Sequence, residues 1–211
     1  MQIKKSGLAF FILMMSKVAL GHPVAYEGAT GVMTWNQAFM SDTWITYSFR
    51  PDMAIAGRFM RMEMPNGSLS YSGLQYDYLL KRWNGDDSQS NIYIYGGAGV
   101  TQFNSLAGTA PLGGFEADAE DRKYFAMFKS EYMKPSVGDE FAHTEARLGI
   151  APYEAEYNEV ATWFMVQVQW HPNLVKKIVT TPLARIYYKS FLFESGVSLE
   201  GDWMTNFMFH F

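Results

Sequence analysis

Apolar and polar residues alternate along most of the chain after residue 30. A clear case is the run 74–81, LQYDYLLK, in which large apolar side chains take nearly every second position. The runs 142–151, 164–171 and 204–211 repeat the pattern. A period of two is that of a β-strand whose two faces meet different surroundings. The pattern therefore predicts an all-β protein.

Ten segments carry this alternation or are bounded by residues typical of turns, such as Pro65-Asn66-Gly67. They are 30–39, 43–50, 53–64, 68–82, 90–101, 120–133, 140–151, 160–171, 183–198 and 202–211. An antiparallel up-and-down barrel of about ten strands has both termini at one end. In this arrangement the long connection 102–119 lies at the opposite end, and 172–182 is a turn of unusual length at the end that holds the termini.

The first 21 residues have the three parts of a secretory signal peptide. Lys4 and Lys5 form a charged start, residues 7–15 are apolar, and Ala19-Leu20-Gly21 supplies the small residues of a cleavage site. The apolar run is far shorter than the roughly 20 residues of a membrane-spanning helix. The predicted division is residues 1–21 as signal peptide and residues 22–211 as one barrel domain, with the mature chain beginning at His22.

The composition favours a barrel that faces lipid. Aromatic residues make up 17% of the chain, yet the mean hydropathy is −0.12. A transmembrane barrel reconciles the two values, because it spreads aromatic side chains over its outer surface and keeps a polar interior. The absence of cysteine excludes disulfides and lipoprotein acylation. Removal of the three signal-peptide lysines would lower the formal net charge from −4 to −7, which argues against nucleic acid as a partner.

The end of the chain carries the most specific pattern. Thr205, Phe207, Phe209 and Phe211 alternate with more polar or flexible side chains up to the last residue. This strand resembles the C-terminal assembly signal of small bacterial outer-membrane β-barrel proteins, and the strand pattern extends the resemblance over the mature chain. The resemblance implies a Gram-negative outer membrane as the location. It also implies outer-membrane lipid, lipopolysaccharide and the barrel assembly machinery as partners.

The polar faces of the predicted strands define the interior of such a barrel. They carry charges of both signs and several amides: Arg58, Gln75, Asp77, Lys81, Lys129, Glu131, Glu145, Arg147, Gln167, Gln169, His171, Glu194, Asn206 and His210. Buried charges need partners, and open porins need about 16 strands. We therefore expect a non-enzymatic protein with a narrow, polar lumen that is largely filled by side chains.

An outer-membrane enzyme of the protease or lipid-modifying type is an alternative. Ten strands is also the number found in the omptin proteases, which resemble one another in rim residues that are not recognisable here. Asp86-Asp87 falls in a predicted periplasmic turn, and His143, with Glu145 two residues on, falls near the periplasmic end of its strand. No cluster of serine, histidine and acid is apparent, so no catalytic residue is assigned.

Methionines on one strand suggest a second alternative, a copper-handling protein. Met60, Met62 and Met64 share a strand face with Arg58, and an arginine facing lipid at the midplane costs roughly 2–4 kcal/mol. This face is therefore expected to be luminal. Thioether and imidazole ligands suit Cu(I), and copper is the only cofactor that the sequence suggests.

Three further residues extend this candidate metal set. Met208 and His210 share a face of the last strand, and His22 would supply both an α-amine and an imidazole at the mature N-terminus. The simpler explanation is that methionines fill gaps in an irregular interior. The two explanations differ in whether Met60, Met62, Met64, Met208 and His210 converge.

Overall fold

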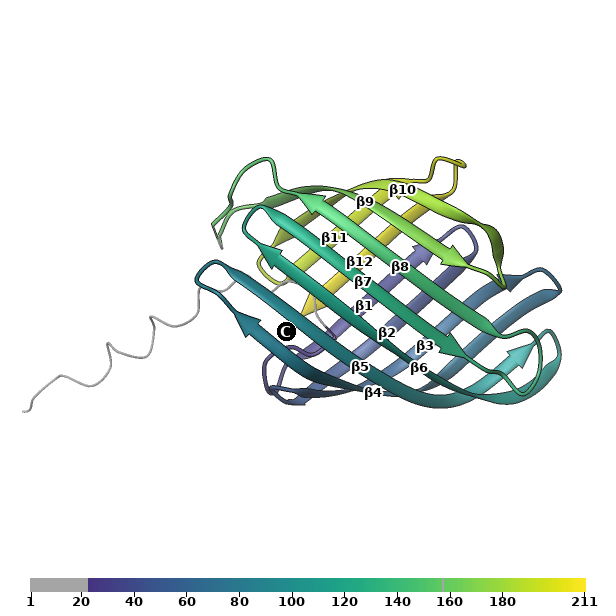
Figure 1. The fold of residues 1–211 in the computed structure, drawn as a ribbon. Coiled ribbons are helices and arrows are strands. Elements are labelled where there is room, and N and C mark those ends of the chain that lie inside the picture. Colours follow the sequence, from purple (N-terminus) through teal and green to yellow (C-terminus); the bar gives the residue numbers. More distant parts are fainter. Residues whose placement is uncertain (1–22, 157) are drawn as a thin grey trace, which may run out of the picture.

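The computed structural model describes residues 23–156 and 158–211, so the predicted signal peptide and His22 lie outside the described residues. The described chain forms twelve antiparallel strands in a closed barrel (Figure 1). Their bounds are β1 Thr30–Gln37, β2 Met40–Arg50, β3 Met53–Met64, β4 Gly67–Asn84, β5 Ser88–Phe103, β6 Leu106–Asp121, β7 Tyr124–Met133, β8 Phe141–Ile150, β9 Ala161–His171, β10 Val175–Tyr188, β11 Phe191–Val197 and β12 Trp203–His210. The predicted antiparallel barrel is confirmed, but the strand number of about ten is wrong.

The first error is the loop predicted over 102–119, most of which is β6. This strand is rich in glycine and alanine, so it lacks the apolar alternation of its neighbours. Its small residues make room for rings from the adjacent strand. A side chain built at Gly114 would place its Cβ 2.5 Å from the Tyr95 hydroxyl oxygen. The hydrophobic pattern does not reveal this strand, because the large side chains that fill this side of the lumen come from a neighbouring strand.

The second error is the single strand predicted over 183–198. The chain reverses at Lys189 and Ser190, so that β10 and β11 form a hairpin. Lys189 has a φ of 55°, a left-handed conformation that is uncommon outside glycine and asparagine. Neither glycine nor proline marks this turn. The predicted connection 172–182 is correspondingly wrong, because β10 begins at Val175.

Each end of the barrel can be identified from these strands. We call the end that holds Thr30 and Phe211 the terminal end, and the opposite end the distal end. Because the prediction did not include β6, the strands that follow it run in the opposite direction to the one predicted. The structure therefore places His143 near the distal end and the 172–174 turn also at the distal end, both opposite to the prediction. The unpredicted turn at Lys189 and Ser190 adds a second reversal, so the last strand runs in the predicted direction.

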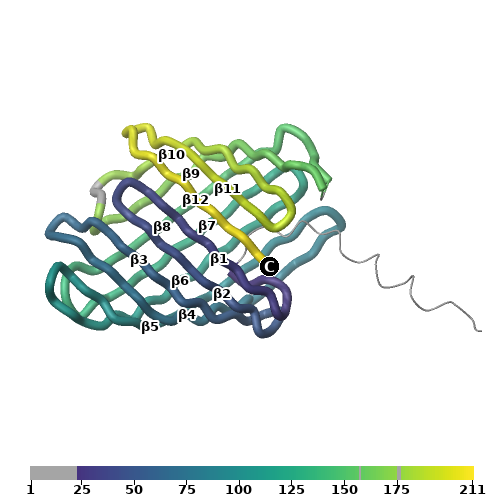
Figure 2. Tube along the Cα trace, turned by 180° about the vertical axis from the view of Figure 1, so that it is seen from behind, coloured from purple at the N-terminus to yellow at the C-terminus, as the bar shows by residue number. Residues whose placement is uncertain are grey.

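The first and last strands close the barrel. Seven residue pairs join β1 to β12, from Gly31 with His210 to Gln37 with Met204. Beyond them, Thr30 and Phe211 exchange two backbone hydrogen bonds of 2.9 Å each. Figure 2 shows the end of the chain lying against β1 from behind. Each of the twelve described strands thus has a hydrogen-bonded neighbour on both sides, and no strand presents a whole open edge to another chain.

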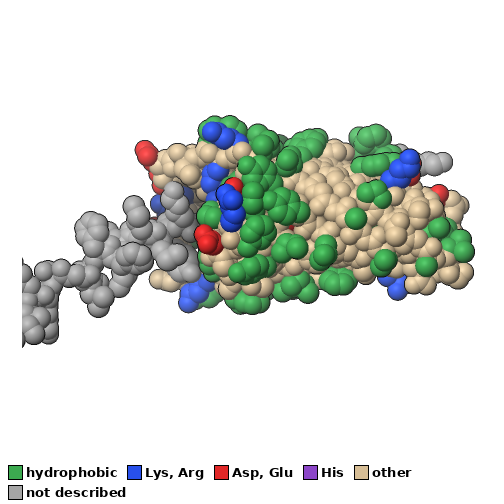
Figure 3. Space-filling model, turned by 90° about the horizontal axis from the view of Figure 1, so that it is seen from below, with side chains coloured by type: hydrophobic (Ala, Val, Ile, Leu, Met, Phe, Trp, Pro, Cys, Tyr) green, Lys and Arg blue, Asp and Glu red, His purple; other side chains and the backbone are tan. Residues whose placement is uncertain are grey.

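The outer surface is apolar over much of the barrel. Large exposed side chains project outward from nearly every strand, including Phe49, Ile94, Phe164, Ile186 and Phe209. Figure 3 shows one face of the barrel, on which hydrophobic side chains are densest over the half near the terminal end. Toward the distal end, β3 to β6 instead expose polar side chains: Arg61, Glu63, Ser72, Gln102 and Thr109. No helix formed by the described residues is long and apolar enough to cross a membrane.

Candidate functional site

The buried charged and polar side chains of the described residues lie mainly in the lumen of the barrel. Inward-facing side chains occupy much of it, and one cavity between them has a volume of about 70 Å³. This volume accommodates a few water molecules at most. The described residues give the lumen a central region of ion pairs, a large apolar cluster toward the distal end and three smaller apolar clusters elsewhere.

Arg58 is the centre of the first ion-pair cluster. Its guanidinium donates to Asp42 on β2 at 2.7 Å and to Glu131 on β7 at 2.9 Å. It also donates to Gln75 Oε1 at 3.0 Å, and Gln75 in turn donates to Asp77 at 2.7 Å. Arg58 is 1% exposed. Charge-assisted and bidentate hydrogen bonds of this kind compensate for the loss of hydration of a buried guanidinium.

Glu194 on β11 is the centre of a second cluster. It accepts hydrogen bonds from Arg185 at 2.6 Å, Asn206 at 2.7 Å and Arg147 at 3.0 Å. Arg147 also lies 2.6 Å from a carboxylate oxygen of Glu145. Four neighbouring or nearly neighbouring strands are thus joined through their inward faces as well as through their backbones.

His143 links the two clusters. Its Nδ1 lies 3.3 Å from Glu131 and its Nε2 lies 3.4 Å from Glu145. The Nε2 contact does not have the geometry of a hydrogen bond, so the hydrogen bond of the ring is the one between Nδ1 and Glu131. Gln169 donates to the other side of Glu145 at 2.7 Å. A continuous series of contacts therefore runs around and across the lumen.

The buried charges do not balance. Among the described residues, seven buried carboxylates face four buried Lys and Arg side chains: Asp42, Asp77, Asp118, Glu120, Glu131, Glu145 and Glu194 against Arg58, Lys129, Arg147 and Arg185. With all carboxylates ionised and the partly buried Arg82 left out, these buried side chains carry an excess of three negative charges.

Lys129 lies inside a cage of aromatic rings. Its Nζ is 4.9 Å from the ring centre of Trp44, 5.5 Å from that of Trp35 and 5.8 Å from that of Tyr95. Cation–π contacts of this length are favourable and gain strength away from water. The cage accounts for a buried amine without requiring a ligand.

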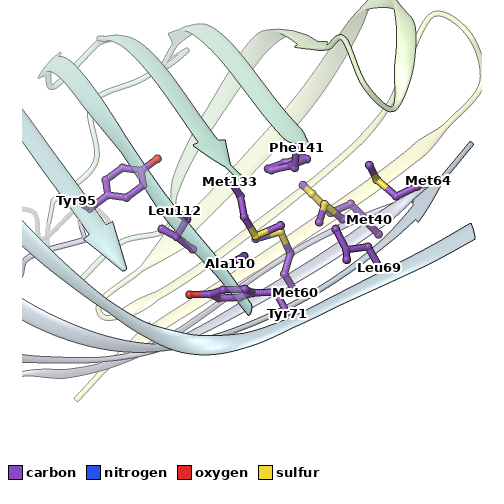
Figure 4. Close-up of a cluster of buried hydrophobic side chains, with 11 residues drawn as sticks. Met40, Met60, Met64, Leu69, Tyr71, Tyr95, Ala110, Leu112, Met133 and Phe141 are labelled. Carbon is purple, nitrogen blue, oxygen red and sulfur yellow. The ribbon is translucent and has the colours of Figure 1, made fainter. Parts of the chain in front are cut away.

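The distal region is apolar and rich in methionine. Met40, Met60, Met62, Met64 and Met133 belong to one buried cluster, which we call the methionine cluster. It also contains Leu69, Tyr71, Tyr95, Ala110, Leu112 and Phe141. The methionines come from β2, β3 and β7, and Figure 4 shows the side chains of Met60 and Met133 converging from opposite sides. They are between 0 and 6% exposed.

His171 lies where the methionine cluster meets the ion pairs. Its ring stacks on His143 with the two ring centres 4.3 Å apart, and it contacts Phe39 and Phe141. Its side chain is fully buried, and neither ring nitrogen has a hydrogen-bond partner. Leaving a buried polar atom without a partner costs about 1–3 kcal/mol. His171 is therefore the polar side chain in the lumen that most needs an explanation.

The predicted metal residues are only partly brought together. Met60, Met62 and Met64 are luminal, as expected, and share the methionine cluster. Met208 belongs to a different cluster with Met33, Trp44, Tyr187 and Leu192, while His210 is only partly buried beside Gly31. His22 lies outside the described residues. Among those residues, no group of three or more His, Asp or Glu side chains is arranged to hold a metal ion.

One predicted luminal residue, Lys81, faces outward. The pairing of β4 with β5 shifts between Leu79 and Lys81. Such a bulge adds a residue to one strand and reverses the alternation beyond it. Lys81 is exposed as a result, and Arg82 turns inward to donate to Asn91 at 2.6 Å. In the sequence, the adjacent leucines Leu79 and Leu80 break the alternation at this point.

Sequence reasoning missed Met40 and Met133 as members of the cluster. Met40 is the first residue of β2 and Met133 the last of β7, so each lies at a strand end where alternation is weakest. The alternation could have placed Met133 in the lumen, since Lys129, Glu131 and Met133 share a face of their strand. His171 was predicted to be luminal but was not associated with methionine.

His143 is the titratable side chain most similar to a catalytic base. Its contacts within the described residues are Glu131, Glu145 and the rings of Phe141 and His171. These are partners that hold an imidazole in place, and none of them is a hydroxyl that it could activate as a nucleophile.

Comparison with known proteins gives similarities in fold only. No family model matches the sequence, and no curated protein matches it. Among solved structures, the KdgM porin, alone and in complex with disordered oligogalacturonate, aligns with 7% identity and a TM-score of 0.48, over 86% of this chain and 98% of the porin. A loop-deletion mutant of OmpT, an outer membrane protein of Vibrio cholerae, aligns with 6% identity and a TM-score of 0.31, over 87% of this chain and 98% of that chain. Values this low assign no function to this chain.

Proposed function

We propose that this protein is an integral barrel of the bacterial outer membrane, non-enzymatic, with a lumen closed by its own side chains. The observation that carries the proposal is the polarity of the closed barrel. Aromatic and aliphatic side chains cover much of its outward surface, whereas the buried charged side chains face inward. This arrangement suits lipid outside and is unfavourable in water, and a closed barrel satisfies every strand edge within the bilayer.

The closed lumen supports a role other than that of a general porin. The Arg58 cluster crosses the interior, and the methionine cluster covers it toward the distal end. The small size of the cavity between these side chains, about 70 Å³, supports a lumen that solutes do not cross. The proposed orientation places the terminal end in the periplasm, after export by the signal peptide 1–21 and cleavage before His22. Lipid and lipopolysaccharide would surround the apolar belt.

Two measurements test this function. Fractionated cells should contain the protein in the outer membrane, with the heat-dependent gel mobility of a barrel. The purified protein in planar bilayers should show no steady ion conductance. Recovery as a soluble periplasmic protein would contradict the membrane assignment, and a steady conductance of porin size would contradict the closed lumen.

A further inference from the structure

We propose that the methionine cluster and His171 form a binding site for Cu(I). The proposal goes beyond the function given above and rests only on the geometry of the lumen. It differs from the metal set expected from the sequence, because Met208 and His210 are not included and Met40, Met133 and His171 are. Thioethers are soft ligands that favour Cu(I) over harder cations, and imidazole also binds copper.

The first support is the convergence of thioethers. Met40 is paired directly with Met62 across β2 and β3, and side chains in such pairs lie within contact distance. Met60 and Met133 belong to strands β3 and β7, which are not neighbours in the barrel, and meet through the lumen (Figure 4). Sulfur ligands from different strands can therefore surround one ion. Residues two apart on one strand, spaced by about 6.6 Å, could not do so by themselves.

The second support is independent of methionine. The His171 imidazole is buried, and neither of its nitrogens has a hydrogen-bond partner. It packs on Phe39 and Phe141, on the side of the methionine cluster that faces the ion pairs. Phe141 is itself a member of the cluster. A bound metal ion is one of the few arrangements that would satisfy a nitrogen in this position. A phenylalanine would fill the same space at no polar cost, so packing alone does not explain a histidine here.

The third support is the path that a cation would follow. The cluster lies behind the polar outer surface at the distal end, where the Arg61 and Glu63 side chains are 72% and 59% exposed. Met64 is the last residue of β3, and Met62 and Met60 follow it inward. An ion entering from the distal end would meet these thioethers in turn. Beyond them, toward the middle of the barrel, lie the ion pairs formed by Arg58, Glu131 and His143.

The test uses the mature full-length barrel in detergent, with Cu(I) kept reduced and a chromophoric chelator competing for it. One variant changes Met60, Met62 and Met133 to leucine, which conserves volume and apolarity. The matched control changes Met33, Met165 and Met208, which are equally buried in other clusters. A His22→Ala version of each protein removes the imidazole expected at the mature N-terminus. Heat-dependent gel mobility verifies that every variant is a folded barrel.

We expect the wild-type protein to bind at least one Cu(I), the cluster variant to bind it at least tenfold more weakly, and the control to differ by less than twofold. His171→Phe should also weaken binding and remove the nitrogen ligand from the X-ray absorption spectrum. The proposal is overturned if the folded wild-type barrel binds no Cu(I), or if both methionine variants lose affinity equally. Unchanged affinity and an unchanged spectrum in His171→Phe would remove histidine from the site. None of these outcomes depends on where the barrel resides in the cell.

Discussion

Arg58 on β3 and Glu131 on β7 meet across the lumen through two hydrogen bonds, of 2.9 Å and 3.1 Å. Three strands lie between them on the shorter way around the barrel. The pair therefore connects two strands that are too far apart in the sheet to share backbone hydrogen bonds. Asp42 on β2 holds the other side of the guanidinium. This one contact links two distant strands through the lumen and pairs each buried charge with an opposite one.

Loss of the Arg58 side chain should be strongly destabilising. Arg58→Met leaves Asp42 and Glu131 buried without their cation, and breaking a buried ion pair costs about 3–5 kcal/mol. The measurement is the midpoint of urea unfolding in detergent, followed by gel mobility. A combined Arg58→Met, Asp42→Asn and Glu131→Gln variant removes the uncompensated charges and should regain part of the stability. Equal stability of Arg58→Met and the wild type would show that the cluster contributes nothing.

The directions of the strands predict which turns are exposed on cells. Epitopes inserted in the turns 104–105 and 172–174 should both be labelled on intact cells, because both turns lie at the distal end. An epitope at 86–87, in the turn between β4 and β5, should be labelled only after the outer membrane is opened. A ten-strand barrel instead places 172–182 in the periplasm. Labelling of 104–105 without 172–174 would therefore favour ten strands. Labelling of 86–87 alone would show that the terminal end faces outward, opposite to the proposed orientation.

Removal of Phe211 should impair assembly. Its backbone N–H and C=O each pair with Thr30 at 2.9 Å, so the deletion opens the last rung between the first strand and the end of the chain. The expected result is a severalfold lower yield of heat-modifiable protein in the outer membrane. Phe211→Leu keeps the two backbone bonds and serves as the control. Normal assembly of the deletion would show that the terminal residue is dispensable for closure.

Glycines in the sheet should differ sharply in their tolerance of a methyl group. A Cβ at Gly99 would lie 2.4 Å from the Ser72 carbonyl oxygen and 2.6 Å from the Gly73 Cα, both backbone atoms. Gly99→Ala should thus force a backbone shift that costs about 1–3 kcal/mol. Gly57→Ala is the control, since its nearest neighbour is a Phe59 ring carbon at 3.6 Å. Urea unfolding of both variants checks the difference, and equal midpoints would contradict it.

The sequence by itself determined the two faces of most strands. Alternation assigned Arg58, Met60, Met62 and Met64 to the inside, and the outcome agrees because a period of two admits only two faces. It also determined the all-β class. It did not reveal β6, because glycine and alanine carry no apolar period, or the reversal at Lys189, because that turn lacks glycine and proline.

The tertiary structure alone decided which inward side chains meet. Met60 and Met133 are 73 positions apart, and only closure of the barrel brings their strands to face one another. The bulge after Leu79 turned Lys81 outward through the pairing of two strands, a property that neither strand has alone. Alternation fixes the face of a residue along its own strand. Its height and partners in the lumen depend on register and closure, which are set by all twelve described strands together.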